Sequence, residues 1–323
     1  MTGPAATPAR LSGLSVVVPV FRSATSLPDL HRRVTEAVPD VADEYEIILV
    51  EDAGGDGSWA VIEALAAADP RVHGVALSRN FGQHNALLCG IRLARFEFVV
   101  TVDDDLQNPP EEIAMLVAGL RDDVDVIYGT PGIEQHGFLR NQASRITKLA
   151  LQTAMGAETA RHVSAFRLFR TRLRDGFATY HGPYVSIDVL LTWSTTRFGH
   201  VSVRHEPRAI GSSTYTVRKL ITHALNMVTG FSTLPLQIAS VIGFLFTVIG
   251  VLVFVYVLVN FLVNGSAVPG FAFLASIIAI FSGAQLFALG IIGEYLARMH
   301  FQTMDRPTYL VSDVTGDDRT RPS

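Results

Sequence analysis

A run of 74 residues without Asp, Glu, Lys or Arg, from 220 to 293, constrains this chain more than any other feature. Within it lie two strongly apolar segments, at about 234–263 and 271–293. At about 1.5 Å of rise per residue, each is long enough as a helix to cross the ~30 Å hydrocarbon core of a bilayer. A buried helical hairpin in a soluble protein is the alternative, and so long a charge-free run argues against it. The sequence therefore predicts a transmembrane helical hairpin.

Basic residues flank this hairpin on both sides. Arg218 and Lys219 precede it, Arg298 and Arg306 follow it, and the connection 264–270 carries no charge. Lys and Arg accumulate on the cytoplasmic side of membrane helices, so both ends are expected in the cytoplasm. The protein is accordingly expected to be a multi-pass protein of the inner (plasma) membrane with a cytoplasmic catalytic domain.

The remaining chain divides by composition. The first residues are rich in Ala, Pro, Thr and Gly without an apolar core, which predicts a disordered leader rather than a signal peptide. Apolar residues on one helical face and basic residues elsewhere predict a helix lying on the membrane surface just before the hairpin. The expected parts are a leader (1–13), a catalytic domain (14–215), an interfacial helix (216–231), the membrane pair (232–296) and a cytoplasmic tail (297–323).

The catalytic part alternates short apolar runs with helical patterns, which is typical of an α/β fold with a largely parallel sheet covered on both faces. Strands are expected at 15–20, 45–50, 72–77, 96–102 and 124–128, with helices at 27–38 and 58–68. Further on we expect helices at 138–155 and 187–195 and strands at 164–169 and 200–205. In such sheets ligands bind beyond the carboxyl ends of the strands, so polar residues after the strands are the candidates for chemistry.

Three adjacent carboxylates follow the fourth expected strand. Alternate side chains of an extended backbone share a face, so Asp103 and Asp105 can point into one site while Asp104 points away. Two oxygen ligands on one face suit Mg²⁺ or Mn²⁺, which can also bind a diphosphate. An acidic surface turn is the alternative. The net charge of −4 gives no general reason to bind nucleic acid.

Several motifs occur in an order that resembles a known family. VVVPVFR, VEDAGGDGS, SRNFGQHNAL, DDDLQNPPE, SAFRLF and HEPRAIGSSTY are similar to segments of family 2 glycosyltransferases of the dolichyl-phosphate mannose synthase and bactoprenol glucosyltransferase type. The resemblance covers about 15–311. It implies a GT-A fold, a Rossmann-like doubly wound sheet that binds a nucleotide-sugar at the strand ends, with polyprenyl phosphate as the acceptor.

The resemblance also implies roles for individual residues. Nucleotide-binding residues would be Pro19, Phe21, Asp52, Arg79, Asp103 and Asp104; metal ligands would be Asp103, Asp105 and Gln107; Arg167 and Arg208 would act with Asp103 and Asp105 in catalysis. By their placement near predicted loop or helix ends, and not by the resemblance, Arg140, Arg145 and Arg208 are the candidates for holding the acceptor phosphate, because guanidinium groups suit phosphate oxygens. Where the family commonly has Asn-Glu, this chain has Arg22-Ser23, and a lysine is replaced by Thr214.

The expected reaction is a metal-dependent, inverting transfer of a hexose-type sugar, with a UDP-sugar as the expected donor and the lipid phosphate oxygen as the nucleophile. The lipid-linked product would serve cell-envelope glycan modification and would need a separate flippase to cross the membrane. Whether the protein forms a homo-oligomer is left open by the sequence. A processive polysaccharide synthase is one rival, although such enzymes usually carry a Gln-x-x-Arg-Trp motif, absent around Trp59 and Trp193. A catalytically silent membrane scaffold is the other.

Overall fold

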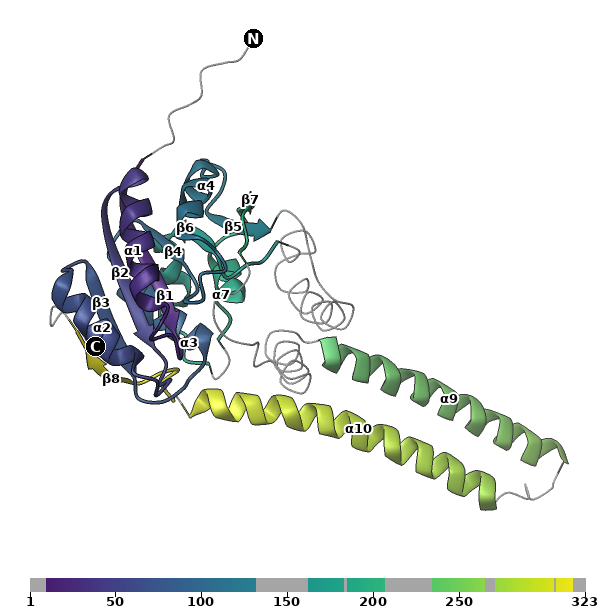
Figure 1. Cartoon of the computed structure of the whole chain (residues 1–323). Helices are drawn as coiled ribbons and strands as arrows, with labels where there is room; N and C mark the ends of the chain where they lie inside the picture. The colour runs from purple at the N-terminus through teal and green to yellow at the C-terminus, as the bar shows by residue number, and fades with distance from the viewer. Residues whose placement is uncertain are drawn as a thin grey trace, which may run out of the picture.

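The computed structural model describes residues 10–131, 162–182, 185–206, 234–264, 271–304 and 306–315. An α/β domain carries a pair of long helices that project away from it (Figure 1). Within the described residues, the domain contains one eight-stranded mixed sheet of order β7-β5-β6-β4-β1-β2-β3-β8. The central strands β4, β1, β2 and β3 are parallel, whereas β6 and β8 run antiparallel to their neighbours.

The strands follow the apolar runs of the sequence. They are β1 (Leu11–Val20), β2 (Ala42–Glu51), β3 (Val72–Leu77), β4 (Phe98–Thr101), β5 (Val126–Pro131), β6 (Arg167–Arg170), β7 (Phe198–Val203) and β8 (Val311–Val314). All seven expected strands are confirmed: β3 has the expected bounds, and the other six have shifted ends. Two features differ from expectation: β1 begins inside the expected leader 1–13, and β8 lies within the expected tail 297–323.

Helices cover both faces of the sheet. They are α1 (Leu27–Ala37), α2 (Ser58–Ala68), α3 (Gln83–Leu93), α4 (Ile113–Ala118) and α7 (Ile187–Ser194), with 3₁₀ turns η1 (Val38–Asp40), η2 (Pro110–Glu112) and η3 (Thr171–Phe177). Helix α3 was not expected from the sequence. The expected helix 138–155 lies outside the described residues.

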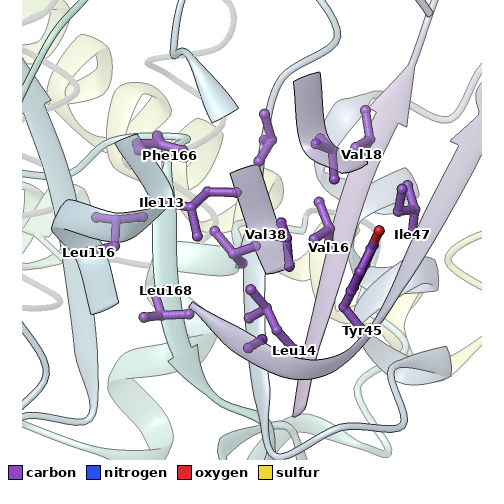
Figure 2. Packing of buried hydrophobic residues seen from close by; sticks show 14 of the residues in the cluster. Leu14, Val16, Val18, Val38, Tyr45, Ile47, Ile113, Leu116, Phe166 and Leu168 are labelled. Atoms are coloured by element: carbon purple, nitrogen blue, oxygen red, sulfur yellow. The ribbon is translucent and has the colours of Figure 1, made fainter. Parts of the chain in front are cut away.

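Side chains alternate along β1 between two separate cores. Val16 and Val18 belong to the cluster that contains α1 and α4 residues, whereas Val17 belongs to the cluster that contains α3 and α7 residues. Figure 2 shows the first of these, with Val16 of β1 beside Val38 and with Ile113 of α4 and Leu168 of β6 among the other labelled members of the cluster. Burial on both faces explains why β1 reads as a continuous apolar run rather than an alternating one.

Two long apolar helices form a hairpin, α9 (Leu234–Asn264) and α10 (Phe271–Thr303). Their most apolar stretches, Leu236–Val263 and Ile280–Ala297, are long enough to span a bilayer and are not buried within the protein. The predicted helical pair is therefore confirmed, although α10 runs ten residues beyond the expected end at 293. Because β7 precedes the hairpin, β8 follows it, and both strands belong to one sheet, both ends of the hairpin lie on the same side of any membrane that it spans.

Candidate active site

Four polypeptide loops meet at the carboxyl edge of the parallel strands. In register, Val20 at the end of β1 lies beside Glu51 at the end of β2, and Glu51 lies beside Ala76 near the end of β3. Thr101 ends β4 beside Val17 of β1. The loops that follow these strands therefore emerge together, at the edge where open α/β sheets bind ligands. This brings the loops carrying Phe21, Asp52, Arg79 and Asp103–Asp105 to one edge.

Among the three aspartates, Asp104 points toward the loop after β1. Its Oδ2 accepts a hydrogen bond from the Phe21 backbone N–H at 2.9 Å and another from the Ser23 hydroxyl. The Ser26 hydroxyl donates to the Asp104 carbonyl at 2.8 Å. Burial raises the pKa of the Asp104 carboxyl, and these hydrogen bonds partly oppose that rise. Asp104 therefore joins two site loops, and its expected nucleotide contact stays a prediction.

Asp103 and Asp105 contact other groups and are half-buried. Asp103 Oδ1 accepts from the side-chain amide of Gln83 at 2.7 Å, and Asp105 Oδ1 accepts from the Gln107 backbone N–H at 3.1 Å. In the described part of the chain, no three His, Cys, Asp or Glu side chains converge into a complete metal cage. A pair of carboxylates suits a Mg²⁺ or Mn²⁺ ion that takes its other ligands from water and a diphosphate, so these residues fit such an ion. Gln107 meets Asp105 through its backbone N–H, and its metal contact stays a prediction.

Asp52 holds the loop that follows β3. Its two carboxylate oxygens accept hydrogen bonds from the backbone N–H groups of Phe81 and Gly82, at 2.6 and 2.8 Å. The side chain is almost fully buried, and this burial raises the pKa of its carboxyl. Asp52 thus positions a site loop, and its expected contact with the base stays a prediction. Arg79 of the same loop is exposed, with its guanidinium 4.6 Å from the centre of the Phe81 ring.

The loops after β1 and β2 pack tightly against each other. Glu51 accepts from the backbone N–H groups of Ala53 and Gly54, and Arg22 Nε donates to the Gly54 carbonyl at 3.2 Å. A Cβ on Gly54 would lie 2.7 Å from the Arg22 backbone nitrogen, so only glycine fits. Arg22, Ala53 and Leu106 are the non-glycine residues with positive φ in the described ranges, and they lie in the loops after β1, β2 and β4 respectively. Strained backbone of this kind gathers at functional sites.

The segments 21–23 and 51–57 were expected at the site because they follow strands, but no individual role was predicted for Ser23 or Glu51. The Gly54-Gly55 pair close to Glu51 indicates a tight turn. Phe21 is 44% exposed, as an aromatic ring that stacks on a base would be. Pro19, in contrast, is buried within β1 itself.

Arg167 has a different environment from the one expected of a catalytic cation. It is 1% exposed, its guanidinium pairs with Asp188 of α7, and its Nε donates to the Thr101 hydroxyl at 3.2 Å. Tyr128 also donates to Asp188 Oδ1, at 3.0 Å. The charge of Arg167 is thus already neutralised by a buried carboxylate, which favours a structural role, and its expected catalytic role stays a prediction. Arg140, Arg145, Arg208 and the expected interfacial helix 216–231 lie outside the described residues.

The strand order and the loops at the carboxyl edge are those of an α/β domain of the GT-A class. Residues 15–179 match the sequence profile of glycosyl transferase family 2. The chain therefore belongs to this family, and the expected class of enzyme is confirmed.

Relatives extend the likeness to nearly the full length. The chain is 34% identical over 310 residues to the undecaprenyl-phosphate 4-deoxy-4-formamido-L-arabinose transferase of Proteus mirabilis, covering 95% of both chains. It is 33% identical to the transferase of the same name from Pseudomonas fluorescens, covering 96% of this chain and 92% of the relative. The similarity to polyprenyl-phosphate sugar transferases expected from the motifs is confirmed.

Solved structures support the fold. Glucosyl-3-phosphoglycerate synthase from Mycobacterium tuberculosis superposes with a TM-score of 0.50 at 14% identity, covering 68% of this chain and 78% of that one. A crystal structure of the same synthase with Mn²⁺, UDP-glucose and phosphoglyceric acid also gives a TM-score of 0.50, at 15% identity. At this identity the likeness shows the GT-A fold alone.

Proposed function

We propose that this protein transfers a sugar from a nucleotide-sugar, with a UDP-sugar as the expected donor, to polyprenyl phosphate at the cytoplasmic face of the membrane. The observation that carries the proposal is the pair of half-buried carboxylates, Asp103 and Asp105, at the carboxyl edge of a sheet whose chain continues into a membrane-length hairpin. Relatives named as undecaprenyl-phosphate sugar transferases, aligned over almost the whole chain, support the acceptor class.

In this proposal the acidic side chains of the site bind the metal ion, and the aromatic and basic side chains bind the nucleotide. Asp103 and Asp105 would hold Mg²⁺ or Mn²⁺, which when bound neutralises charge on the diphosphate leaving group. Phe21 would stack on the base, and Arg79 would add positive charge beside the phosphates. A lipid phosphate oxygen then forms a bond to the anomeric carbon from the face opposite the diphosphate, while the bond to the diphosphate oxygen breaks and UDP leaves. The phosphate is already anionic, so no general base is required.

Two sugars are candidates for the donor. The motif resemblance supports a hexose, whereas the names of the relatives in Proteus and Pseudomonas support 4-deoxy-4-formamido-L-arabinose. Basic residues on both sides of the hairpin support the cytoplasmic orientation of the catalytic domain. The aspartates argue against a silent scaffold, because an unused cluster of carboxylates would cost free energy through mutual repulsion.

The test measures UDP release by full-length protein in detergent, with Mn²⁺, polyprenyl phosphate and a panel of UDP-glucose, UDP-galactose and UDP-4-deoxy-4-formamido-L-arabinose. Asp105→Asn should lower turnover by about a hundredfold or more, as expected when a charged ligand is lost from a site that stabilises the transition state. Asp123→Asn is the matched control, because the Asp123 side chain is 76% exposed and distant from this edge of the sheet.

Two results would contradict the proposal. Release that does not depend on polyprenyl phosphate would contradict the acceptor, and full activity of Asp105→Asn would contradict the metal site. The anomeric configuration of the lipid-linked product, read by NMR coupling constants, tests the mechanism. An inverted configuration is expected, and retention would exclude a single displacement.

A further inference from the structure

The C-terminal segment, residues 306–315, returns from the hairpin and adds a strand to the sheet. Strand β8 pairs antiparallel with β3, and the Leu310 carbonyl accepts a hydrogen bond from the Ser78 N–H at 2.8 Å. At its other end, the Thr315 N–H donates to the Gly74 carbonyl at 2.8 Å. Because β8 is antiparallel, it enters the sheet at the carboxyl end of β3. This is the edge at which the candidate active site lies.

Tyr309 anchors the segment in the core on the α3 side of the sheet. Its side chain is 9% exposed and belongs to the cluster that includes Cys89 and Leu87 of α3. The Arg92 guanidinium lies over the Tyr309 ring, 5.7 Å from its centre, and also donates to the carbonyls of Ala178 and Tyr180. The Tyr309 hydroxyl hydrogen-bonds with the Cys89 thiol. The segment is therefore bound by side chains as well as by the strand ladder.

This segment contacts the loop that carries Arg79. Ser78, whose N–H is bonded to Leu310, immediately precedes Arg79. On the far side of Arg79, the Phe81 and Gly82 N–H groups are bonded to Asp52. Arg79 is thus held between two anchors, one inside the domain and one supplied by the chain after the membrane helix.

The connection from the membrane helix to this anchor is short. From Thr303 at the end of α10 to Val311 at the start of β8 the chain advances eight residues, which span at most about 29 Å when fully extended. On the other side of the hairpin, thirty residues separate Val203 of β7 from Leu234 of α9. The C-terminal connection therefore limits the distance between the sheet and the membrane more strictly. In Figure 1 the domain end of α10 lies near α3, on the way to β8.

We propose that the C-terminal segment is a positioning element of the enzyme, which holds the donor loop 78–82 in its binding conformation and ties it to the cytoplasmic end of α10. The expected effect on donor KM rests on the proposed function. The docking of the segment and its effect on the donor loop do not depend on that function. Without the segment, the donor loop keeps its Asp52 anchor but loses the bond at Ser78. Membrane insertion is unaffected, because both helices remain.

The single cysteine of the chain reports directly on docking of this segment. Cys89 is fully buried, and this burial raises the pKa of its thiol to about 12, so a maleimide should label the native protein slowly. Two truncated proteins separate the strand from the residues that follow it. Deleting 306–323 removes β8 and Tyr309, whereas deleting 316–323 keeps both and serves as the control.

Point variants control for faster Cys89 labelling that is caused by general destabilisation of the domain. Tyr309→Ala is compared with Tyr45→Ala, because both tyrosines are 9% exposed but Tyr45 packs in the other core cluster, away from Cys89. We expect the 306–323 deletion and Tyr309→Ala to speed labelling of Cys89 by about tenfold or more, and Tyr45→Ala and the 316–323 deletion to change it little. A synthetic peptide of residues 306–315 should restore protection to the 306–323 deletion.

Positioning is measured by amide exchange of 78–82, which needs no substrate, and by donor KM. We expect faster exchange in the 306–323 deletion and a rise in donor KM of about five- to tenfold, as for loss of one anchoring hydrogen bond, with kcat within about threefold. If the 306–323 deletion leaves Cys89 labelling unchanged, the segment does not dock against α3 as proposed. If it leaves amide exchange of 78–82 unchanged, the segment does not position the donor loop. If the wild type turns over no donor, the proposed function fails while labelling and exchange still decide the structural inference.

Discussion

The buried pair of Arg167 and Asp188 gives the most direct test of the difference between a catalytic and a structural arginine. Side-chain exposure is 1% for Arg167 and 8% for Asp188, so neither charge is solvated by bulk water. Asp188→Asn leaves the guanidinium in the core without its carboxylate. Loss of one partner from a buried pair costs roughly 3–5 kcal/mol of the free energy of unfolding. For a domain of this size that corresponds to a fall in Tm on the order of 10 °C.

Removal of both charges should cost less than removal of one. In Arg167→Met/Asp188→Leu no buried charge remains, and replacing such a pair by apolar side chains is often nearly neutral. Tyr128 is a graded control, because Tyr128→Phe removes only its hydrogen bond to Asp188, at about 1–3 kcal/mol. Thermal unfolding in detergent, with each single variant beside the double, measures the coupling energy.

Activity of the double variant then separates the two roles. A structural pair predicts that the folded double variant keeps turnover within about tenfold of the wild type, whereas a catalytic Arg167 predicts a much larger loss. Two results would refute our reasoning: a Tm of Asp188→Asn equal to the wild type, or single and double effects that simply add. Either would mean that the guanidinium finds another partner or contributes outside this pair.

Three further predictions follow from the site and its supports. Gly54→Ala should destabilise the domain by about 1–3 kcal/mol and raise donor KM, because its Cβ would meet the Arg22 backbone; thermal unfolding and kinetics check both. Asp104→Asn should lower Tm but keep more of the metal-dependent activity than Asp105→Asn, since Asp104 bonds to Phe21 and Ser23. An equal loss of activity in the two variants, measured over a Mn²⁺ titration, would contradict this. Hydrogen bonding to Arg197 lowers the pKa of Asp125 from 3.8 to about 2. Its contribution of about 2 kcal/mol is therefore present above about pH 4 and lost as pH falls toward 2, and Tm should fall less between pH 5 and 3 in Asp125→Asn than in the wild type.

Local patterns were enough to predict the central strands and the hairpin. Strands β1 to β4 are apolar runs followed by polar turns, and the hairpin lacks charge over tens of residues. Both patterns are formed by residues adjacent in the sequence, so they can be recognised without knowledge of the fold. Strand alternation was expected to set Asp104 apart from its neighbours, but β4 ends at Thr101 and the following backbone turns, so alternation does not explain the contact of Asp104 with the loop after β1. Helix α3 was missed because its first residues, Gln83-His84-Asn85, read as a continuation of the loop.

Long-range pairing could not be predicted from the sequence. Strand β8 has four residues, two of them exposed polar side chains, and its identity depends on an edge of β3 that is more than 230 residues away. The same limit applies to Arg167. An arginine inside SAFRLF can face a phosphate or a carboxylate, and only the fold brings Asp188 of α7 against it. Charge type can be predicted from a motif, but charge partners depend on tertiary packing.

The direction of β8 has a consequence for how donor and acceptor could meet. A parallel strand would have entered the sheet at the amino end of β3, with α10 leaving from the edge opposite the aspartates. The antiparallel strand instead brings the chain from α10 to the carboxyl end of β3, where Ser78 begins the donor loop. A polyprenyl phosphate keeps its headgroup at the membrane surface because its chain is held in the hydrocarbon. The acceptor cannot travel far to the donor, so the enzyme must hold its donor site close to the membrane, and a short connection ending at the donor loop satisfies this requirement.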